Sequence, residues 1–306
     1  MNRILLSLVL VMLLGMQLPA LTLKQAEDSL KKIGPRCFKG SDQEKALACE
    51  QFGNLLYQAL ELDGAFNYPF DSLKFIARLT APDNAFRIFN WNLPYADGTH
   101  KYFGFILVDE QKVRAKLPPN AKRFVLYTLT DKSAEIRNPE LSELSPEKWY
   151  GALYYKIILT THKKKKYYTL LGWDGNNNQS WKKLIDVITF NKSGKLIFGE
   201  ELLFHRDRRS SRRVIFEFKA EVIMALKYED DKKRIVFDRL APEVSGAEGM
   251  YQFYTQTFEY DSYVFKKGKW QFVADADAKN NKDRKDKLYR DPNNQDAPKN
   301  DGLKKQ

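Results

Sequence analysis

The chain has 306 residues, of which 43% are hydrophobic and 13% aromatic. This composition supplies one sizeable core, or at most two, once both ends are set aside, and it excludes a long array of domains. The formal net charge is +12, from 51 Lys and Arg against 39 Asp and Glu, so the surface should attract anionic partners and resist self-association.

Residues 1–20 have the pattern of a signal peptide. Arg3 supplies a positive start, Ile4 to Met16 is apolar, and Leu18 to Ala20 ends in a small residue suited to cleavage. The apolar run is too short to span a bilayer, which takes ~20 residues. No Cys lies near the cleavage site, which argues against a lipid anchor. The sequence predicts export to the periplasm or beyond, peripheral to the outer membrane at most, with no transmembrane segment after cleavage.

Residues 21–64 are predicted to form a helical pair. Thr22 is placed to cap the first helix, and Ser41 with Glu44 fits a capping box at the start of a second helix that ends near Leu62. A pair this short cannot bury its own apolar faces. We therefore expect it to dock on the rest of the domain.

The chain has two cysteines, and both fall in this helical pair. Cys37 lies between the helices and Cys49 lies on one face of the second. In an oxidising compartment a disulfide between them would contribute roughly 2 to 3 kcal/mol through the unfolded state. Two free buried thiols are the alternative. Because the chain has the features of an exported protein, the sequence favours the disulfide.

Residues 65–273 are predicted to form an antiparallel β domain. The apolar pattern changes from helical to alternating, and about a dozen aromatic-rich and β-branched runs follow, joined by short links. Short links imply antiparallel pairing. The predicted fold class is mainly β, an antiparallel meander preceded by a short α-helical pair. A β-propeller-like and a β-sandwich arrangement both fit this number of strands.

Residues 274–306 differ in composition from the rest of the chain. Asp, Lys, Asn and Pro dominate, and Tyr289 is the single aromatic residue. Little apolar surface is present to offset the entropy of ordering a chain. The sequence therefore predicts a disordered charged tail.

The candidate ligand-binding residues lie in or beside two polar loops, residues 92–99 and 174–180. The candidates are Trp91, Tyr95, Trp173, Trp181, Asn176 and Asn178. If both loops lie at one end of a sheet, the flat rings could stack on the apolar faces of a saccharide while the amides bond its hydroxyls. The alternative is that the Trp residues are buried and anchor the sheet.

The loop 174–180 also places side-chain oxygens at every second position, as a calcium loop does. It has one carboxylate, Gln179 stands where such a loop needs Gly, and Ile185 stands where it needs a bidentate Glu. The pattern favours an Asx-rich loop whose side chains cap their own backbone, and the sequence predicts no metal site.

Two basic runs lie between predicted strands. The first is Lys163 to Lys166, and the second contains Arg206, Arg208, Arg209, Arg212 and Arg213. Charged side chains at hairpin tips are commonly just exposed to solvent. They also prevent the edges of a sheet from pairing with other strands. The functional alternative is contact with anionic envelope lipid or polysaccharide, with Arg208, Arg209, Arg212 and Arg213 as the anion-binding residues. No stacking aromatics interleave with these charges, which argues against nucleic acid.

The chain carries no recognisable catalytic or cofactor signature. His100, His162 and His205 have no His partner at metal-ligand spacing, and there is neither a Gly-x-Ser-x-Gly elbow nor a Gly-rich phosphate loop. The sequence predicts no catalytic residue and no cofactor. The alternative is a hydrolase of polysaccharide or peptide in which carboxylates or His205 line a cleft.

The string from Tyr168 to Asn178, continued by Ile185-Asp186-Val187 and Phe198-Gly199, resembles one in uncharacterised exported proteins of Bacteroidetes-type bacteria. The resemblance implies an envelope location in a Gram-negative cell and carries over no functional residue. With the leader pattern, it leads us to expect a non-enzymatic β-domain protein that binds or scaffolds an envelope component, either a glycan or an anionic lipid.

Overall fold

A computed structural model describes residues 21–205 and 209–276, which belong to one compact unit. The protein is mainly β, with 43% strand and 19% helix, and its sheets are preceded by a helix pair, which confirms the predicted fold class. The predicted signal peptide, residues 1–20, lies outside the described residues. The same is true of the predicted tail beyond residue 276.

The two N-terminal helices begin where their capping residues predict. They are α1 (Leu23–Ile33) and α2 (Asp42–Leu60), joined by the 3-10 helix η1 (Gly34–Phe38). The Thr22 and Ser41 side chains each accept a hydrogen bond from the third backbone N–H of their helix, at 3.3 Å. Both capping boxes are complete, because Gln25 and Glu44 reach back to the capping residues.

The first sheet is an antiparallel meander that follows the helix pair. In order across the sheet its strands are β1 (Ala77–Thr80), β2 (Phe86–Pro94), β3 (His100–Asp109) and β4 (Phe124–Thr130). A single-turn helix, α3 (Glu110–Val113), follows β3. Phe89, Trp91 and Leu93 pack against the helices, whereas Phe86 and Ile88 face the opposite side. Because successive side chains of a strand point to opposite faces, this sheet has two apolar faces.

Two further sheets complete the described structure. The second contains β5 (Leu153–His162), β6 (Lys165–Asp174), β7 (Ser180–Phe190), β8 (Leu196–Phe198) and β11 (Val214–Lys219). The third contains β9 (Leu203–Phe204), β10 (Ser210–Ser211), β12 (Leu226–Glu229), β13 (Arg234–Pro242), β14 (Tyr254–Lys266) and β15 (Lys269–Val273). Strand neighbours are antiparallel except for β15 and β9, which pair in parallel. Short 3-10 turns, η2 (Ser133–Glu135), η3 (Pro146–Lys148) and η4 (Tyr251–Phe253), lie in the connections.

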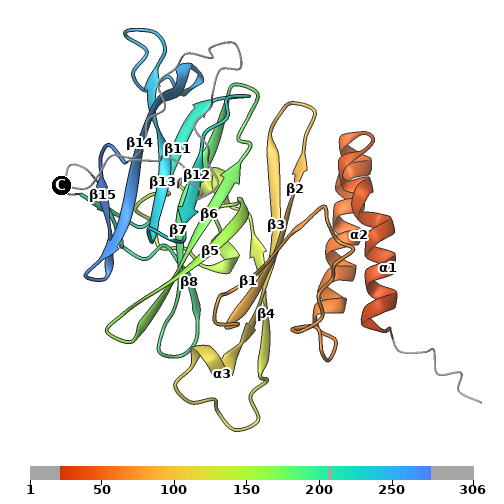
Figure 1. Cartoon of the computed structure of the whole chain (residues 1–306). Coiled ribbons are helices and arrows are strands. Elements are labelled where there is room, and N and C mark those ends of the chain that lie inside the picture. The colour runs from red at the N-terminus through yellow and green to blue at the C-terminus, as the bar shows by residue number, and fades with distance from the viewer. Residues whose placement is uncertain (1–20, 206–208, 277–306) are drawn as a thin grey trace, which may run out of the picture. The chain divides into compact units, whose positions relative to one another are not determined.

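The elements stack in four layers, seen from right to left in Figure 1 as the helix pair and then the three sheets. Strand β6 shows why the middle sheet has a core on each side. Its Tyr168 and Leu170 face the first sheet, and its Tyr167 and Leu171 face the third. This face-to-face stacking extends a sandwich to three sheets and differs from the radial arrangement of propeller blades.

The predicted disulfide between Cys37 and Cys49 is wrong. Both thiols are free and buried where the helices pack on the first sheet, and the sulfur atoms are not at disulfide distance. They hydrogen-bond to each other, and this bond together with burial raises the pKa of the Cys49 thiol far above its ordinary value. The helices bring the two cysteines together as predicted, but the thiols act as small core side chains.

Glu27 of α1 ties the helix pair to the segment that leads into the sheets. Its buried carboxylate accepts hydrogen bonds from the Tyr68 hydroxyl (2.7 Å) and from the Ser72 backbone N–H (2.8 Å) and hydroxyl (2.7 Å). Burial raises the pKa of Glu27, but these three donors outweigh burial and leave the pKa below its ordinary value. The ionised carboxylate is therefore the form that stabilises the fold.

Replacing Glu27 with Gln is expected to lower the free energy of unfolding by about 1 to 3 kcal/mol near neutral pH, because buried donors lose a charged acceptor. A lowered carboxyl pKa contributes stability above the unfolded-state value, and that contribution is lost as pH falls through the folded-state value. The difference between wild type and Glu27→Gln should therefore shrink on acidification. Urea unfolding over a pH series measures it, and Glu61→Gln, at an exposed carboxylate, is the control. An equal loss of stability in both variants would contradict this role of Glu27.

Candidate functional site

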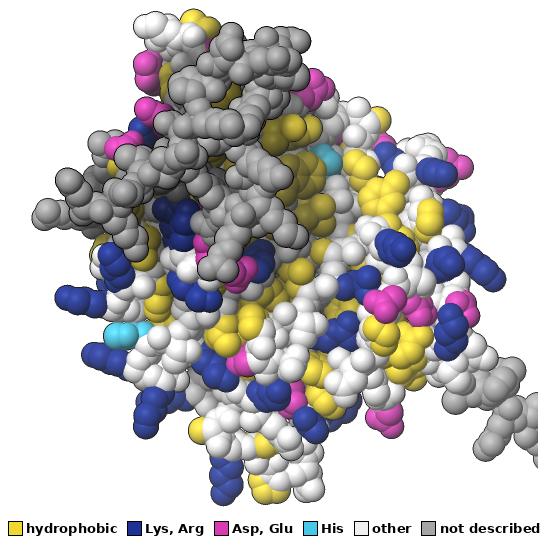
Figure 2. Space-filling model, in the orientation of Figure 1, with side chains coloured by type: hydrophobic (Ala, Val, Ile, Leu, Met, Phe, Trp, Pro, Cys, Tyr) yellow, Lys and Arg dark blue, Asp and Glu magenta, His cyan; other side chains and the backbone are white. Residues whose placement is uncertain are grey.

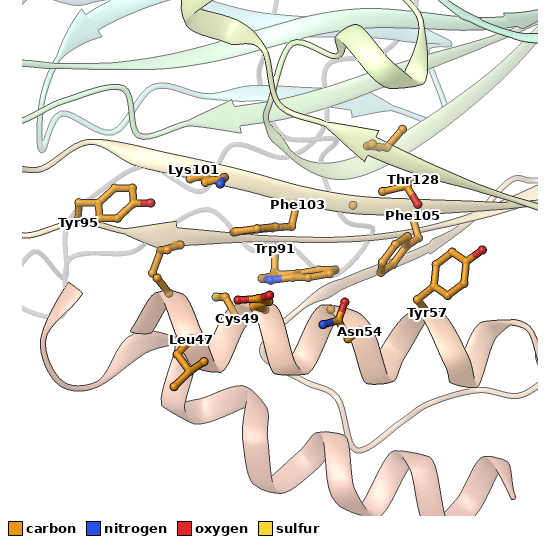
Figure 3. A pocket seen from close by; sticks show the side chains of 16 residues that line it. Leu47, Cys49, Asn54, Tyr57, Trp91, Tyr95, Lys101, Phe103, Phe105 and Thr128 are labelled. Carbon is orange, nitrogen blue, oxygen red and sulfur yellow. The ribbon is translucent and has the colours of Figure 1, made fainter. Parts of the chain in front are cut away.

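A groove of about 530 Å³ lies between α2 and the outer face of the first sheet (Figure 3). We call it the helix–sheet groove. It is lined by Ala46, Leu47, Cys49, Glu50, Gly53, Asn54 and Tyr57 from α2, and by Trp91, Leu93, Tyr95, Lys101, Phe103, Gly104, Phe105, Thr128 and Leu129 from the β2–β4 region. Five of these sixteen residues are aromatic, and the formal charges of the lining are one acid and one base.

Trp91 forms the base of the groove and is a core residue. Its ring is 2% exposed, stacks on Phe103 at 5.5 Å between centroids with planes 9° apart, and meets Phe52 edge-on at 5.0 Å. Helix α2 packs directly against the ring at Gly53, where a Cβ would lie at ordinary van der Waals distance, 3.5 Å from Trp91. The indole N–H lies beside the Cys49 thiol and makes no hydrogen bond of regular geometry with a described residue. Both faces of the ring are thus occupied by protein.

The accessible part of the groove lies beside Trp91 rather than on it. Tyr57 is 42% exposed, and its ring meets Phe105 edge-on at 5.9 Å. Asn54 and Thr128 are exposed and add an amide and a hydroxyl beside these rings. Lys101 places its ammonium 5.4 Å from the centre of the Phe103 ring. Such a surface suits a ligand with apolar faces and several hydroxyl groups.

The two polar loops predicted to carry the site do meet. The Asn178 amide donates a 2.8 Å hydrogen bond to the Asp97 carbonyl, which joins the β6–β7 loop to the β2–β3 loop. Trp173 lies at this junction. The centre of its ring is 6.0 Å from that of Trp181 and 5.4 Å from that of His100. The candidates nevertheless divide between two places: Trp91 and Tyr95 line the groove, and Trp173, Trp181, Asn176 and Asn178 lie at the end of the second sheet.

Side chains of the Asn-rich loop are engaged with the protein itself. Asn176 donates to Ser180 at 2.8 Å, and its oxygen accepts from Lys182 at 2.8 Å. The Asn177 oxygen accepts the backbone N–H groups of Gln179 and Ser180. This is the Asx-rich loop that the sequence favours over a calcium loop. Among residues 21–205 and 209–276, no group of three or more His, Cys, Asp or Glu could hold a metal ion.

A second, polar cleft of about 470 Å³ opens beside this loop. Its lining includes His100, Asp131, Asp174 and Lys182. The buried Asp174 accepts hydrogen bonds from the Tyr102 hydroxyl (2.9 Å) and the Asn176 backbone N–H (2.8 Å) on one oxygen, and from the Tyr150 hydroxyl (3.4 Å) on the other. Burial raises the pKa of Asp174. Because both oxygens already have protein donors, Asp174 serves to hold two tyrosines in place.

The described members of the predicted anion-binding run, Arg209, Arg212 and Arg213, lie in different surroundings. Arg208 lies outside the described residues, as does Arg206. Arg209 lines a pocket with His205, whereas Arg212 donates to the Gly199 carbonyl at 2.8 Å. The side chain of Arg213 is fully buried and pairs with Asp186 at 2.8 Å, so it belongs to the interior and not to an anion-binding surface.

Comparison with protein-family models, with curated protein sequences and with solved structures finds no match for this chain. Among the helices that the structure describes, none is long and apolar enough to cross a membrane. The ligand of the groove therefore has to be inferred from the chemistry of its lining residues. Sequence reasoning found Trp91 and Tyr95 but missed Tyr57, Phe103 and Phe105, because contact between a helix and a strand this far away in the chain leaves no local pattern.

Proposed function

We propose that this protein is an exported, non-enzymatic binding protein of the cell envelope and that the helix–sheet groove binds a neutral saccharide. The accessible ring of Tyr57, set beside Phe105 and flanked by Asn54 and Thr128, carries this proposal. Flat rings stack on the apolar faces of sugars, and the amide and hydroxyl groups bond sugar hydroxyls. The leader pattern of residues 1–20 supports the location.

The charge of the groove favours a neutral ligand over an anionic one. Glu50 and Lys101 are its charged lining residues, and their formal charges cancel. A strongly anionic ligand would meet the Glu50 carboxylate without an excess of cations to offset it. The positive net charge of the chain therefore resides elsewhere on the molecule.

The test is a thermal melt of the full chain with a panel of neutral oligosaccharides. A ligand that binds the native state stabilises it by ~2.7 kcal/mol at a hundredfold excess over its Kd. Tyr57→Ala and Asn54→Ala should each weaken binding, Tyr57→Ala by about tenfold or more. Tyr251→Ala is the matched control, because Tyr251 is 43% exposed, close to the 42% of Tyr57, and lies outside the groove. Equal effects of the two Tyr variants, or no shift with any saccharide, would overturn the proposal.

The hydrolase alternative requires a histidine and an acid, or two acids, facing one pocket. His100, Asp131 and Asp174 do line the polar cleft together. However, Asp131 accepts the Tyr102 backbone N–H (3.0 Å) and both donors of Ser133, and Asp174 is held by its own donors. A general acid or base must reach the proton of its substrate, and both of these carboxylates are already engaged by protein donors, so we prefer the binding function.

A further inference from the structure

A cationic cup of about 800 Å³ lies among the tips of the second sheet and the segment around α3. Its cations are Lys112, Arg114, Lys164, Lys165, Lys166 and Lys192. No Asp or Glu is among the described residues that line it. In Figure 2, Lys and Arg side chains crowd the lower left of the face, where Figure 1 places the tips of the second sheet. The cup is distinct from the helix–sheet groove and shares no lining residue with it.

Half of these cations have carboxylate partners that are not among the residues lining the cup. Lys166 pairs with Asp83 at 2.7 Å, Lys165 pairs with Glu200 at 2.6 Å, and Arg114 pairs with Glu110. Salt bridges of this kind fix the positions of the side chains while neutralising them.

The other three cations are not neutralised by the residues that the structure describes. Lys112 donates to the Asp83 carbonyl at 2.9 Å and has no carboxylate partner there. Lys164 and Lys192 are exposed and make no ion pair with a described residue. The cup therefore has a net positive field directed at its opening.

The turn that carries Lys164 has an unusual backbone for its sequence. Lys163 has φ 47° and Lys164 has φ 66° between β5 and β6. Two consecutive positive φ values suit a tight hairpin turn that Asn-Gly occupies without strain. Lysine at both positions costs conformational energy, and such strain concentrates at functional positions. The turn holds Lys164 at the rim of the cup.

The floor of the cup is apolar. Val113 and Phe190 are partly buried and pack on the core between the first and second sheets, and the Phe190 ring meets Tyr168 edge-on at 6.1 Å. A free inorganic anion or a nucleic acid phosphate would contact the lysines but leave this floor uncovered. An amphiphile with a negative head group would use both parts of the site.

We propose that the cationic cup binds an anionic phospholipid at a membrane surface, with the phosphate between Lys112, Lys164 and Lys192 and the start of an acyl chain on Val113 and Phe190. This contact is additional to the saccharide site and does not depend on it. It would place the protein peripherally on a membrane, held by charge and a small apolar contact.

Sedimentation of the full chain with vesicles tests the contact. Vesicles of equal parts phosphatidylcholine and phosphatidylglycerol should bind the protein, and vesicles of phosphatidylcholine alone should not. Each surface lysine contributes about a fivefold factor to such binding, so Lys164→Ala with Lys192→Ala should weaken partitioning by roughly twenty-five-fold. The control pair Lys31→Ala with Lys32→Ala removes the same charge from the exposed face of α1 and should change it little. Equal losses in the two pairs would show attraction by net charge alone and overturn the site.

A second measurement distinguishes binding of the whole lipid from binding of its head group alone. A soluble short-chain phosphatidylglycerol should bind more tightly than glycerol phosphate, by at least about tenfold, because only the former reaches the apolar floor. Equal affinities, or stabilisation by inorganic phosphate without vesicle binding, would mean that the cup takes a free phosphate, and the lipid assignment would fail. Melting temperatures of the lysine variants should match wild type, since neither Lys164 nor Lys192 pairs with a described residue.

Discussion

Replacing Arg213 with Met is expected to lower the free energy of unfolding by about 3 to 5 kcal/mol, because it leaves Asp186 charged and unpaired in the interior. Both side chains have zero exposure, and the Arg213 guanidinium donates to Asp186 at 2.8 Å and to the Pro139 carbonyl at 2.5 Å. The Tyr154 hydroxyl also donates to Asp186 at 3.2 Å and accepts from Trp149 at 3.0 Å. The loss would therefore disturb a connected buried network. Urea unfolding of the purified protein measures it.

Two companion variants show whether the buried charge is the cause. Arg212→Met, at the neighbouring arginine that pairs with Glu143 at the surface, should cost about 1 kcal/mol. The double variant Asp186→Leu with Arg213→Met should recover much of the loss, because a neutral pair leaves no buried charge. If Arg213→Met lowers the free energy of unfolding no more than Arg212→Met does, the buried ion pair does not stabilise the fold as described.

The Arg213–Asp186 pair illustrates what a single sequence does not reveal. The sequence shows five arginines in a run and suggests an anion-binding surface, but the position of each guanidinium depends on strand pairing. Val214 lies opposite Ile185 in the antiparallel pairing of β11 with β7, and this register brings Arg213 beside Asp186. Strands β8, β9 and β10 separate β7 from β11 in the chain, so no hairpin link predicts this register.

The sequence predicted the structural features that depend only on residues close together in the chain. The capping residues Thr22 and Ser41 gave the starts of both helices, because a cap needs only residues within one turn. Hairpins with short links, such as β5 with β6, followed from two alternating apolar runs that lie close together in the chain. The stacking of three sheets did not follow, because it depends on which strand faces pack together. The cysteines show the same limit: their proximity was predictable, but the separation of the sulfur atoms was not.

The candidate site was predicted in part for the same reason. Trp91 and Tyr95 stand out because Trp and Tyr beside a polar loop are conspicuous in a sequence. Tyr57 and Phe103 do not, because each looks like one more apolar position in a helix or a strand. Only the packing of α2 across β2 and β3 turns these residues into one groove. The same packing makes Trp91 the covered base of that groove, which agrees with the alternative in the sequence analysis that the Trp is buried and anchors the sheet.

Truncating Trp91 to Ala is expected to lower the free energy of unfolding by about 3 to 5 kcal/mol, the range for removing a large buried aromatic side chain. The ring is enclosed by Phe52, Phe103 and Phe105, and α2 would lose the contact of Phe52 with this ring. An exposed ligand platform would behave differently, since surface substitutions stay within about 0.5 kcal/mol. Chemical denaturation of Trp91→Ala therefore tells a core residue from a binding platform.

Trp91→Phe makes this distinction sharper. It keeps an aromatic ring in the core and removes an indole N–H that makes no regular hydrogen bond with a described residue, so it should cost much less than Trp91→Ala. Because Tyr57 and not Trp91 presents an accessible ring, Trp91→Phe should also keep the affinity for a saccharide that Tyr57→Ala loses. A Trp91→Phe protein that melts like wild type but no longer binds the saccharide would show that the indole itself touches the ligand. The groove would then have to open at α2 before the ligand could enter.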